Sequence, residues 1–227
     1  MEGNKQMDIA FDIETIRNSS RLDAMPEPEV KTGNLKDPAK IAEKVAEARA
    51  EQVAKMALNP LYGRICAAVF IARNRAGEFE SLRLSAADSD DEERELIEKC
   101  FAVLGNPELR LITWNGIGFD LPFLYRRAVL TGADITGAPP LTSWTKRYST
   151  GPHIDLMQIW GGWNSTQFAR LDDVGRAVVN EHKIEIDLRE FPELVKTEAG
   201  REKILDYCEQ DVRLTYQIFD RFKGILF

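Results

Sequence analysis

Cysteine and histidine are scarce in this sequence, which limits the kinds of site it can form. The 227 residues include only three cysteines and two histidines. Cys66, Cys100 and Cys208 are odd in number, far apart and outside any CxxC pattern. Neither a disulfide framework nor a zinc site is therefore indicated, and we expect all three to be small core residues.

Long hydrophobic runs and targeting signals are also missing. No apolar segment approaches the ~18 residues that a membrane-spanning helix needs. The first residues, MEGNKQMD, lack the basic and apolar regions of a secretory signal. We therefore expect a cytoplasmic protein without a membrane segment. A hydrophobic content of 44% with 30% charged residues is ordinary for a globular protein, and we expect a single domain over residues 1–227.

Glycine loops that bind phosphate and an excess of positive charge are absent as well. The chain has no GxxxxGK(S/T) segment, and GIG at residues 116–118 is not followed by the third glycine of a dinucleotide loop. A nucleotide-binding ATPase is therefore not indicated. The net charge of −7 argues against a protein that coats nucleic acid through bulk electrostatics, but it allows a local binding site.

What is present is a series of strands that lead into helices. Three such strands, with an antiparallel pair early in the chain, predict an α/β fold with a mixed central sheet flanked by helices. The predicted strands are an opening strand within 7–18, then 64–73, 79–85, 109–114 and a strand-to-helix segment over 153–160. The predicted helices are 37–58, 90–105, one beginning near 120, 168–180 and 198–223.

A polar stretch and a helix follow the first strand. Residues 17–36 are long for a structureless connection in a compact domain. Asp37 then suits a helix N-cap and Pro38 the first helical position, and strong helix formers continue to about Leu58. The apolar stripe of this helix is thin. We predict a helical arm, about residues 17–60, that packs on a partner or lies beside the substrate.

Two acids interrupt the otherwise apolar first strand. Because side chains alternate along a strand, Asp12 and Glu14 share one face, opposite to Ile9, Phe11 and Ile13. Like charges about 7 Å apart repel and raise each other's pKa unless a cation lies between them. The acids therefore indicate a divalent metal, although a solvated strand end is an alternative explanation.

Two further acids lie at positions that suggest a site. Asp120 follows a strand end, where catalytic groups gather in α/β sheets, although it also suits a helix N-cap. Asp211 lies within the apolar stripe of the last helix, on the same side as Tyr207. A buried carboxylate costs several kcal/mol unless it is paired, hydrogen-bonded or bound to metal. The alternative is a core tyrosine with an acid that reaches solvent or pairs with a nearby arginine, and Arg201 and Arg213 are not obvious partners.

Taken together, FDIET, NGIGFD and YCEQD resemble, in this order, the three motifs of the DEDD superfamily of 3′-to-5′ exonucleases, which have a ribonuclease H-like fold. Tyr207 precedes Asp211 by four residues, so the chain resembles the tyrosine (DEDDy) type. The nearest likeness is to the exonuclease domain of family-B DNA polymerases. Only 16 residues follow Asp211, so we expect a free-standing exonuclease.

The resemblance also implies the role of each motif residue. Asp12, Glu14, Asp120 and Asp211 would hold two divalent cations, and Tyr207 would orient the attacking water. Two such ions can activate water and stabilise the leaving oxygen in phosphodiester hydrolysis. Oxygen ligands without histidine or cysteine favour Mg²⁺, with Mn²⁺ able to substitute.

Substrate contacts are implied only by analogy. Ile16, Asn115 and Phe119 would lie beside the terminal nucleotides, and Phe119 could stack on a base. The segment SWTKRYST, residues 143–150, alternates aromatic and basic residues and either contacts the phosphate backbone or is an ordinary solvated loop. We expect His153 to be structural and Asp155 to support the metal site.

The expected activity is metal-dependent release of nucleoside monophosphates from the 3′ ends of nucleic acid. We favour single-stranded DNA, from the resemblance to polymerases. An enzyme that trims RNA 3′ ends is an alternative, because the motifs do not encode contacts to the 2′-hydroxyl. A catalytically inactive nucleic-acid-binding module is another. A polymerase or other replication or repair partner for the arm is left open.

Overall fold

A mixed five-stranded sheet lies at the centre of the protein. The computed structural model describes residues 6–33, 35–184 and 186–226. The sheet has the order β3-β2-β1-β4-β5; β1 pairs antiparallel with β2 and parallel with β4. The antiparallel pair β2–β3 and the mixed sheet confirm the sequence prediction. The strands are β1 (Met7–Arg17), β2 (Gly63–Arg73), β3 (Phe79–Ser85), β4 (Leu109–Thr113) and β5 (His153–Asp155).

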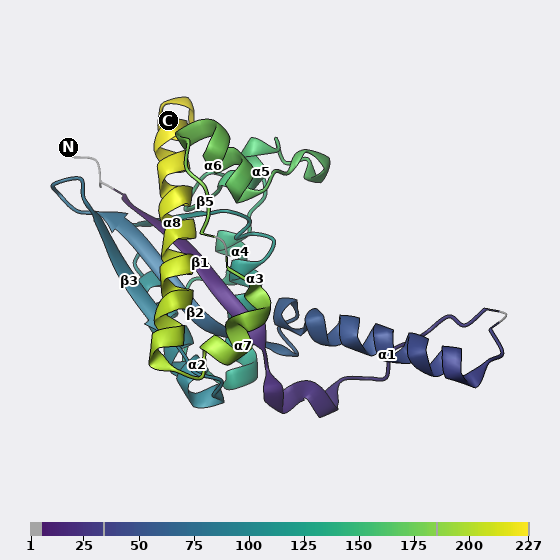
Figure 1. Ribbon diagram of the computed structural model, residues 1–227. Helices are drawn as coiled ribbons and strands as arrows, with labels where there is room; N and C mark the ends of the chain where they lie inside the picture. The colour runs from purple at the N-terminus through teal and green to yellow at the C-terminus, as the bar shows by residue number, and fades with distance from the viewer. Residues whose placement is uncertain (1–5, 34, 185, 227) are drawn as a thin grey trace.

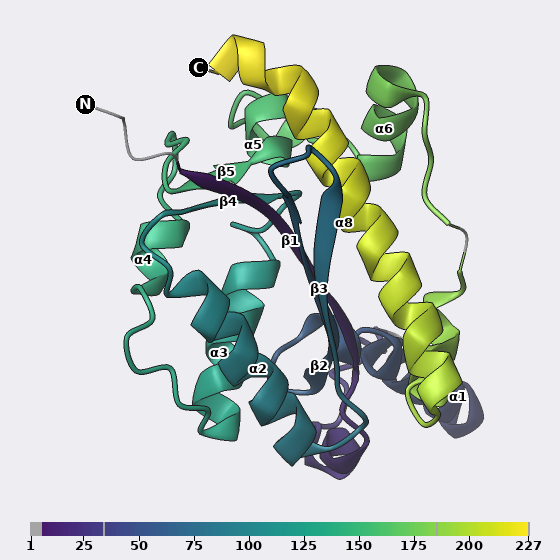
Figure 2. The same cartoon turned by 90° about the vertical axis from the view of Figure 1, so that its left-hand side faces the viewer.

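Helices cover both faces of this sheet (Figures 1 and 2). One face packs against α2 (Asp90–Leu104), α3 (Asp120–Thr131) and α4 (Leu141–Trp144). The other packs against α5 (Leu156–Trp160), α6 (Leu171–Val179), α7 (Phe191–Leu194) and α8 (Glu198–Leu226). The 3₁₀ helices are η1 (Ser19–Ala24), η2 (Met56–Leu58), η3 (Ser165–Gln167) and η4 (Leu188–Glu190). Within the described residues, no helix combines the length and apolarity needed to cross a bilayer.

Side-chain alternation along β1 divides its residues between two hydrophobic cores. Ile9, Phe11 and Ile13 are buried beneath α2 and α3. Ala10 belongs to the core beneath α8. Because residues two apart share a face, Asp12 and Glu14 point toward α8, as the sequence predicted.

The last helix presents the predicted apolar stripe to the sheet. Ile204, Cys208 and Ile218 are at most 1% exposed, and Asp211 lies among them at 2%. The long helix α8 packs against β1 and β2 and crosses in front of them in Figure 1. This packing brings an acid from near the end of the chain over the acids of the first strand.

The arm projects from the body instead of joining its core (Figure 1). Its helix α1 spans Pro38–Ala54, with Asp37 accepting a hydrogen bond from the N–H of Ala39, and none of its residues is buried. The helix ends at Ala54 and not at Leu58, because the chain tightens into η2, where Met56 is 1% exposed and anchors the root of the arm. Arg49 ties the helix to the segment that leads into it by donating to three backbone carbonyls, those of Leu22, Met25 and Pro26.

Candidate active site

The register of the sheet places two acids beyond the end of β4. The pairing between β1 and β4 ends at Ala10 opposite Ile112, whereas β1 continues to Arg17. Asp12 and Glu14 therefore lie at the carboxyl end of the parallel strands, where ligands bind in α/β sheets.

Two buried thiols support the backbone behind these acids. Cys208 lies 3.7 Å from the carbonyl oxygen of Asp12 and Cys66 lies 3.4 Å from that of Glu14, each as a hydrogen-bond donor. The register of β1 against β2 shifts just after Glu14, which is the irregularity that strands adopt when they re-aim a side chain. All three cysteines are buried, as predicted, and two of them contact the strand that carries the acids.

A tight turn carries the chain from β4 to Asp120. Asn115 has φ +72°, and a Cβ atom on Gly116 would lie 2.3 Å from Oγ1 of Thr113. A side chain at Gly116 is therefore excluded. The turn leads directly into α3, whose first residue is Asp120.

Asp155 organises this turn from the neighbouring strand. Its carboxylate accepts hydrogen bonds from the backbone N–H groups of Asn115 and Ile117, at 3.1 and 2.9 Å, and also caps α5. His153 is structural, since its ring lies between Oγ1 of Thr113 at 2.8 Å and the carbonyl of Trp144 at 2.6 Å. Asp155 thus supports the position of Asp120 through the backbone.

The four predicted metal ligands converge from β1, α3 and α8. The carboxyl groups of Asp12 and Asp120 share a hydrogen bond, and Asp211 lies close enough to act electrostatically on both Asp12 and Glu14. Asp120 and Asp211 are each 2% exposed, and Oδ1 of each has no hydrogen-bond partner. Asp12 and Glu14 remain partly exposed. The cluster is therefore open on one side and deficient in positive charge.

Burial and mutual repulsion both change the pKa values of these acids. Burial raises the pKa of Asp12 and Glu14 well above their ordinary values, and the neighbouring carboxylates raise it further. Burial also raises the pKa of Asp120 to about 7, although its hydrogen bond to Asp12 acts in the opposite direction. These carboxylates cannot all ionise at neutral pH unless cations join them.

The donor atoms fit a divalent cation. Carboxylate oxygens of Asp12 and Glu14 lie within 4.8 Å of each other, and the unpartnered oxygens of Asp120 and Asp211 add hard donors. The thiol of Cys208 lies equally near, but burial raises its pKa, so it stays protonated and donates to the backbone of Asp12. A dication would supply the charge that these oxygens lack. The described residues therefore form a candidate metal site at the carboxyl end of β1.

Lys183 is the functional candidate that sequence reasoning missed. It lies in the segment between α6 and η4, and its ammonium group pairs with Oδ2 of Asp211. It also hydrogen-bonds to the hydroxyl of Tyr207. Burial lowers the pKa of Lys183, but the charge of Asp211 and these hydrogen bonds outweigh burial and raise it overall. The only signal in the sequence was that Asp211, a buried acid, needed a partner. No local pattern identified Lys183, which lies 28 residues before it.

The two arginines considered as partners of Asp211 bind elsewhere, as expected. Arg213 pairs with Glu209 at 3.0 Å, and Arg201 donates to the carbonyl of Val195 at 3.0 Å.

Tyr207 lies one helical turn before Asp211 and borders the cluster. Burial raises its pKa to about 12, and the charge of Asp211 adds to this while Lys183 opposes it. The phenol is therefore protonated at neutral pH and can act as a hydrogen-bond donor. Phe191 packs edge-on against its ring, with 5.9 Å between centroids, which restricts the orientation of the ring.

The predicted substrate contacts lie near the cluster, and their roles stay predictions. Ile16 is 1% exposed and belongs to the core beneath α8. Phe119 is partly exposed and lines a groove beside Glu14. Asn115 is held in the turn by its backbone. In segment 143–150, Trp144 is buried within α4, while residues 146–148 are exposed.

Comparison with known proteins assigns the chain to a family. Residues 57–226, about three quarters of the sequence, match the family described as "Predicted 3′-5′ exonuclease related to the exonuclease domain of PolB". The chain belongs to this family. The match includes Asp120, Tyr207 and Asp211, whereas Asp12, Glu14 and most of the arm precede it.

This member of the PolB-like exonuclease family is similar in sequence to archaeal DNA polymerases. The chain is 27% identical over 157 residues to a DNA polymerase of Thermococcus aggregans, which covers 63% of this chain and 8% of the polymerase. It is 25% identical over 146 residues to DNA polymerase 1 of Aeropyrum pernix, covering 60% and 14% respectively. The chain thus spans only a small part of the length of these relatives.

A solved structure confirms the fold of this family member. The family B DNA polymerase from Pyrobaculum calidifontis matches with a TM-score of 0.59 and 18% identity, covering 96% of this chain and 24% of that one. The mixed sheet flanked by helices is therefore the ribonuclease H-like fold that the motifs predicted.

Proposed function

We propose that this protein is a metal-dependent 3′-to-5′ exonuclease that releases nucleoside monophosphates from single-stranded DNA. The observation that carries the proposal is the convergence of Asp12, Glu14, Asp120 and Asp211, with two buried carboxylate oxygens that lack a partner. Fully buried acids that serve only the fold are normally satisfied. Membership of a family described as predicted 3′-5′ exonucleases supports the same reaction.

The four carboxylates are the groups that would hold two divalent cations, Mg²⁺ or Mn²⁺. When bound, such ions supply a water that is nucleophilic at neutral pH and stabilise charge on the leaving oxygen. Asp12 and Glu14 are partly exposed. They therefore lie on the side of the site that an approaching phosphate would meet. Asp120 and Asp211 lie deeper, at 2% exposure, and are held in place by α3 and α8.

Tyr207 and Lys183 act on the attacking water and its surroundings. The protonated hydroxyl of Tyr207 would orient that water by a hydrogen bond, and the hydrogen bond from Lys183 to the same hydroxyl supports this role. Lys183 also balances the charge of Asp211. We therefore assign Lys183 as a positioning residue for Tyr207 and Asp211.

The test uses purified protein and 5′-labelled single strands of DNA and RNA of matched sequence. Each is incubated with Mg²⁺, with Mn²⁺ or with EDTA, beside the Asp12→Ala variant. The expected result is a ladder that shortens from the 3′ end, faster on DNA, and is abolished by EDTA and by the substitution.

Other outcomes of this test discriminate the alternatives. Faster shortening of RNA would replace the DNA assignment with an enzyme that trims RNA 3′ ends. Strand binding without any metal-dependent ladder would overturn the exonuclease proposal in favour of an inactive binding module.

A further inference from the structure

A cavity beside α6, here called the α6 cavity, borders the candidate active site. Its volume is about 610 Å³, within the range of about 300–1,000 Å³ that small-molecule sites occupy. Tyr207 and Lys183 line it, and the ion pair between Lys183 and Asp211 joins it to the acidic cluster. Its other charged lining residues come from α6 and from the chain around η4, and they are Arg170, Asp172, Arg176, Asp187 and Arg189.

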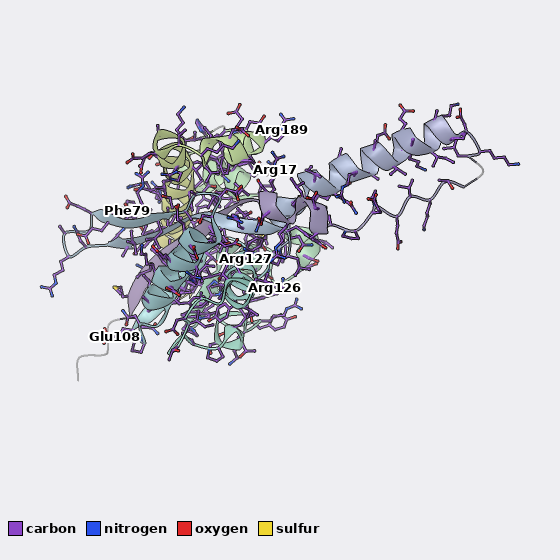
Figure 3. The ribbon with its side chains drawn as sticks, turned by 90° about the horizontal axis from the view of Figure 1, so that it is seen from below. Arg17, Phe79, Glu108, Arg126, Arg127 and Arg189 are labelled. Atoms are coloured by element: carbon purple, nitrogen blue, oxygen red, sulfur yellow. The ribbon has the colours of Figure 1, made fainter. Side chains whose placement is uncertain are left out.

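The cluster also borders a second cavity, on the side of the arm. Glu14 lines this groove together with Val53 and Ala54 of the arm. Arg189 of η4 lines both cavities, and Figure 3 shows it on the side of the body from which the arm projects. The acidic cluster is therefore flanked by one cavity toward the arm and another toward α6.

Positive charge predominates in the α6 cavity. Of the described residues that line it, four are cationic and two are carboxylates, whereas the whole chain has a net charge of −7. Arg176 pairs with Asp172 at 2.9 Å. Arg189 pairs with Asp187 at 2.7 Å. Both arginines are exposed, and exposed ion pairs contribute little free energy. A phosphate dianion can therefore compete for their guanidinium groups.

The same cavity offers apolar surface. Ile184 and Leu188 belong to its lining, and they are 46% and 54% exposed. Nucleobases pack on apolar and aromatic side chains, while arginine side chains bind phosphate. One cavity thus combines the two kinds of contact that a nucleotide needs.

The chemistry of the proposed reaction separates the product from the strand. Water forms a new bond to phosphorus as the bond to the 3′ oxygen of the strand breaks, and these two oxygens lie on opposite sides of the phosphorus. Because Tyr207 would orient the water, the remaining strand lies away from the α6 cavity. The released phosphate is a monoester with a charge of about −1.5 to −2 at pH 7, whereas a phosphodiester carries one negative charge. A cationic cavity therefore favours the product over the strand.

We propose that the α6 cavity binds the released nucleoside 5′-monophosphate, with its phosphate at Arg170 and Arg176. Its base lies against Ile184 and Leu188. This inference rests on the proposed function, to which it adds an exit route for the product past Tyr207. Accumulated monophosphate occupies the cavity and inhibits turnover.

The test measures binding of 2′-deoxyadenosine 5′-monophosphate by isothermal titration calorimetry, in EDTA so that no metal ion holds the phosphate at the acidic cluster. Arg170→Gln removes a charge from the lining, whereas Arg221→Gln removes the same charge from α8 outside the cavity. Both positions are exposed, and circular dichroism verifies that both variants fold. Deoxyadenosine, inorganic phosphate and a short single strand with a hydroxyl group at each end are titrated in parallel.

We expect Arg170→Gln to weaken binding of the monophosphate about tenfold, in line with the loss of one charged hydrogen bond, and Arg221→Gln to bind like the wild type. Deoxyadenosine and inorganic phosphate should bind more weakly than the monophosphate, because each lacks one of its two groups. The substitution at Arg170 should affect the strand much less.

Four results would overturn the inference. They are no binding of the monophosphate to the wild type, equal affinities of the two variants, an equal loss for strand and monophosphate in Arg170→Gln, and inorganic phosphate that binds as tightly as the monophosphate. The third would assign the cavity to the strand, and the fourth would make it a plain phosphate site.

Failure of the cavity and failure of the exonuclease are distinguishable. A wild-type protein that makes no ladder with Mg²⁺ but loses monophosphate binding selectively in Arg170→Gln retains the nucleotide site and refutes the nuclease. A metal-dependent ladder that added monophosphate inhibits equally in both variants retains the nuclease and refutes the cavity.

Discussion

The two faces of the central sheet both bury acidic side chains, but they treat them differently. Beneath α2 and α3, Glu93 is fully buried and accepts two hydrogen bonds from Arg127, at 2.8 and 2.5 Å, and one from the N–H of Ile65. In the cluster at the carboxyl end of β1, which faces α8, Asp120 from the start of α3 and Asp211 from α8 each keep one oxygen without a partner. The fold itself supplies hydrogen-bond partners to the carboxylate of Glu93. The unpartnered oxygens of Asp120 and Asp211 need a bound ligand, such as a cation.

This difference separates a structural charge from a functional one. A buried ion pair with all its hydrogen bonds made is costly to break and contributes to a unique fold. A buried cluster of like charges destabilises the folded protein, and a bound cation offsets that destabilisation. Burial of acids alone therefore does not mark a site in this protein; the lack of partners does.

The largest expected effect tests the functional side of this comparison. Asp12→Asn keeps the shape and removes a charge from the cluster, so we expect activity to fall at least about 10⁴-fold, or about 5 kcal/mol of activation free energy. Thermal unfolding in EDTA should show no loss of stability, because repulsion is relieved. A clear loss of stability would mean that Asp12 is structural.

The next effect tests the structural side. Arg127→Met leaves Glu93 buried without its partner, so we expect the free energy of unfolding to fall by about 3 to 5 kcal/mol. Urea titration measures it. The double variant Glu93→Leu with Arg127→Met should recover part of the loss, since no unpaired charge remains. A single variant as stable as the wild type would contradict the distinction between the two faces.

The pH dependence of stability without metal gives a smaller and directional effect. Asp120 has an ordinary pKa of 3.8 and a pKa of about 7 in the fold, so between these values the folded chain holds a proton that the unfolded chain has released. Stability in EDTA should therefore fall as pH rises from about 4 to about 7, by on the order of a few kcal/mol.

Asp120→Asn is the control for this pH dependence. It removes one of the titrating acids, so the fall in stability between about pH 4 and pH 7 should become shallower. Part of the fall should remain, because the pKa values of Asp12 and Glu14 are also raised. Mg²⁺ should also flatten the curve of the wild type by stabilising the ionised acids. A wild-type stability that rises over this range in EDTA would contradict the raised pKa. Urea unfolding at several pH values measures all three curves.

The smallest effect compares one cysteine from each face. Cys100 lies in the apolar core beneath α2, whereas Cys208 donates to the carbonyl of Asp12. We expect Cys100→Ser to cost about 1 kcal/mol more than Cys208→Ser, because only the second hydroxyl finds an acceptor. Thermal unfolding of both variants measures the difference, and equal costs would show that the Cys208 contact contributes nothing.

Much of the fold and of the acidic cluster was predictable, because local patterns carry that information. Alternation placed Asp12 and Glu14 on one face of β1, and helical periodicity placed Tyr207 and Asp211 on the buried side of α8. Both patterns depend only on neighbouring residues. The resemblance of the three motifs then joined elements that lie far apart in the chain, and the fold comparison agrees with it.

Other features followed from no local pattern. Lys183 reaches Asp211 from a segment that no motif marks. Glu93 and Arg127 belong to different helices, and their pairing depends on how α2 and α3 cross the sheet. The end of α1 at Ala54 follows from the burial of Met56 in the body, which outweighs the helix propensity of the residues around it.

The sequence by itself determined the mixed sheet, the faces of its strands and the identity of the acids, because side-chain period and residue chemistry are local properties. Only the tertiary structure decided which buried acids are satisfied and which are not, where Lys183 lies, and that the arm walls a groove beside Glu14. Those properties depend on distances between residues remote in the chain, and packing alone sets such distances.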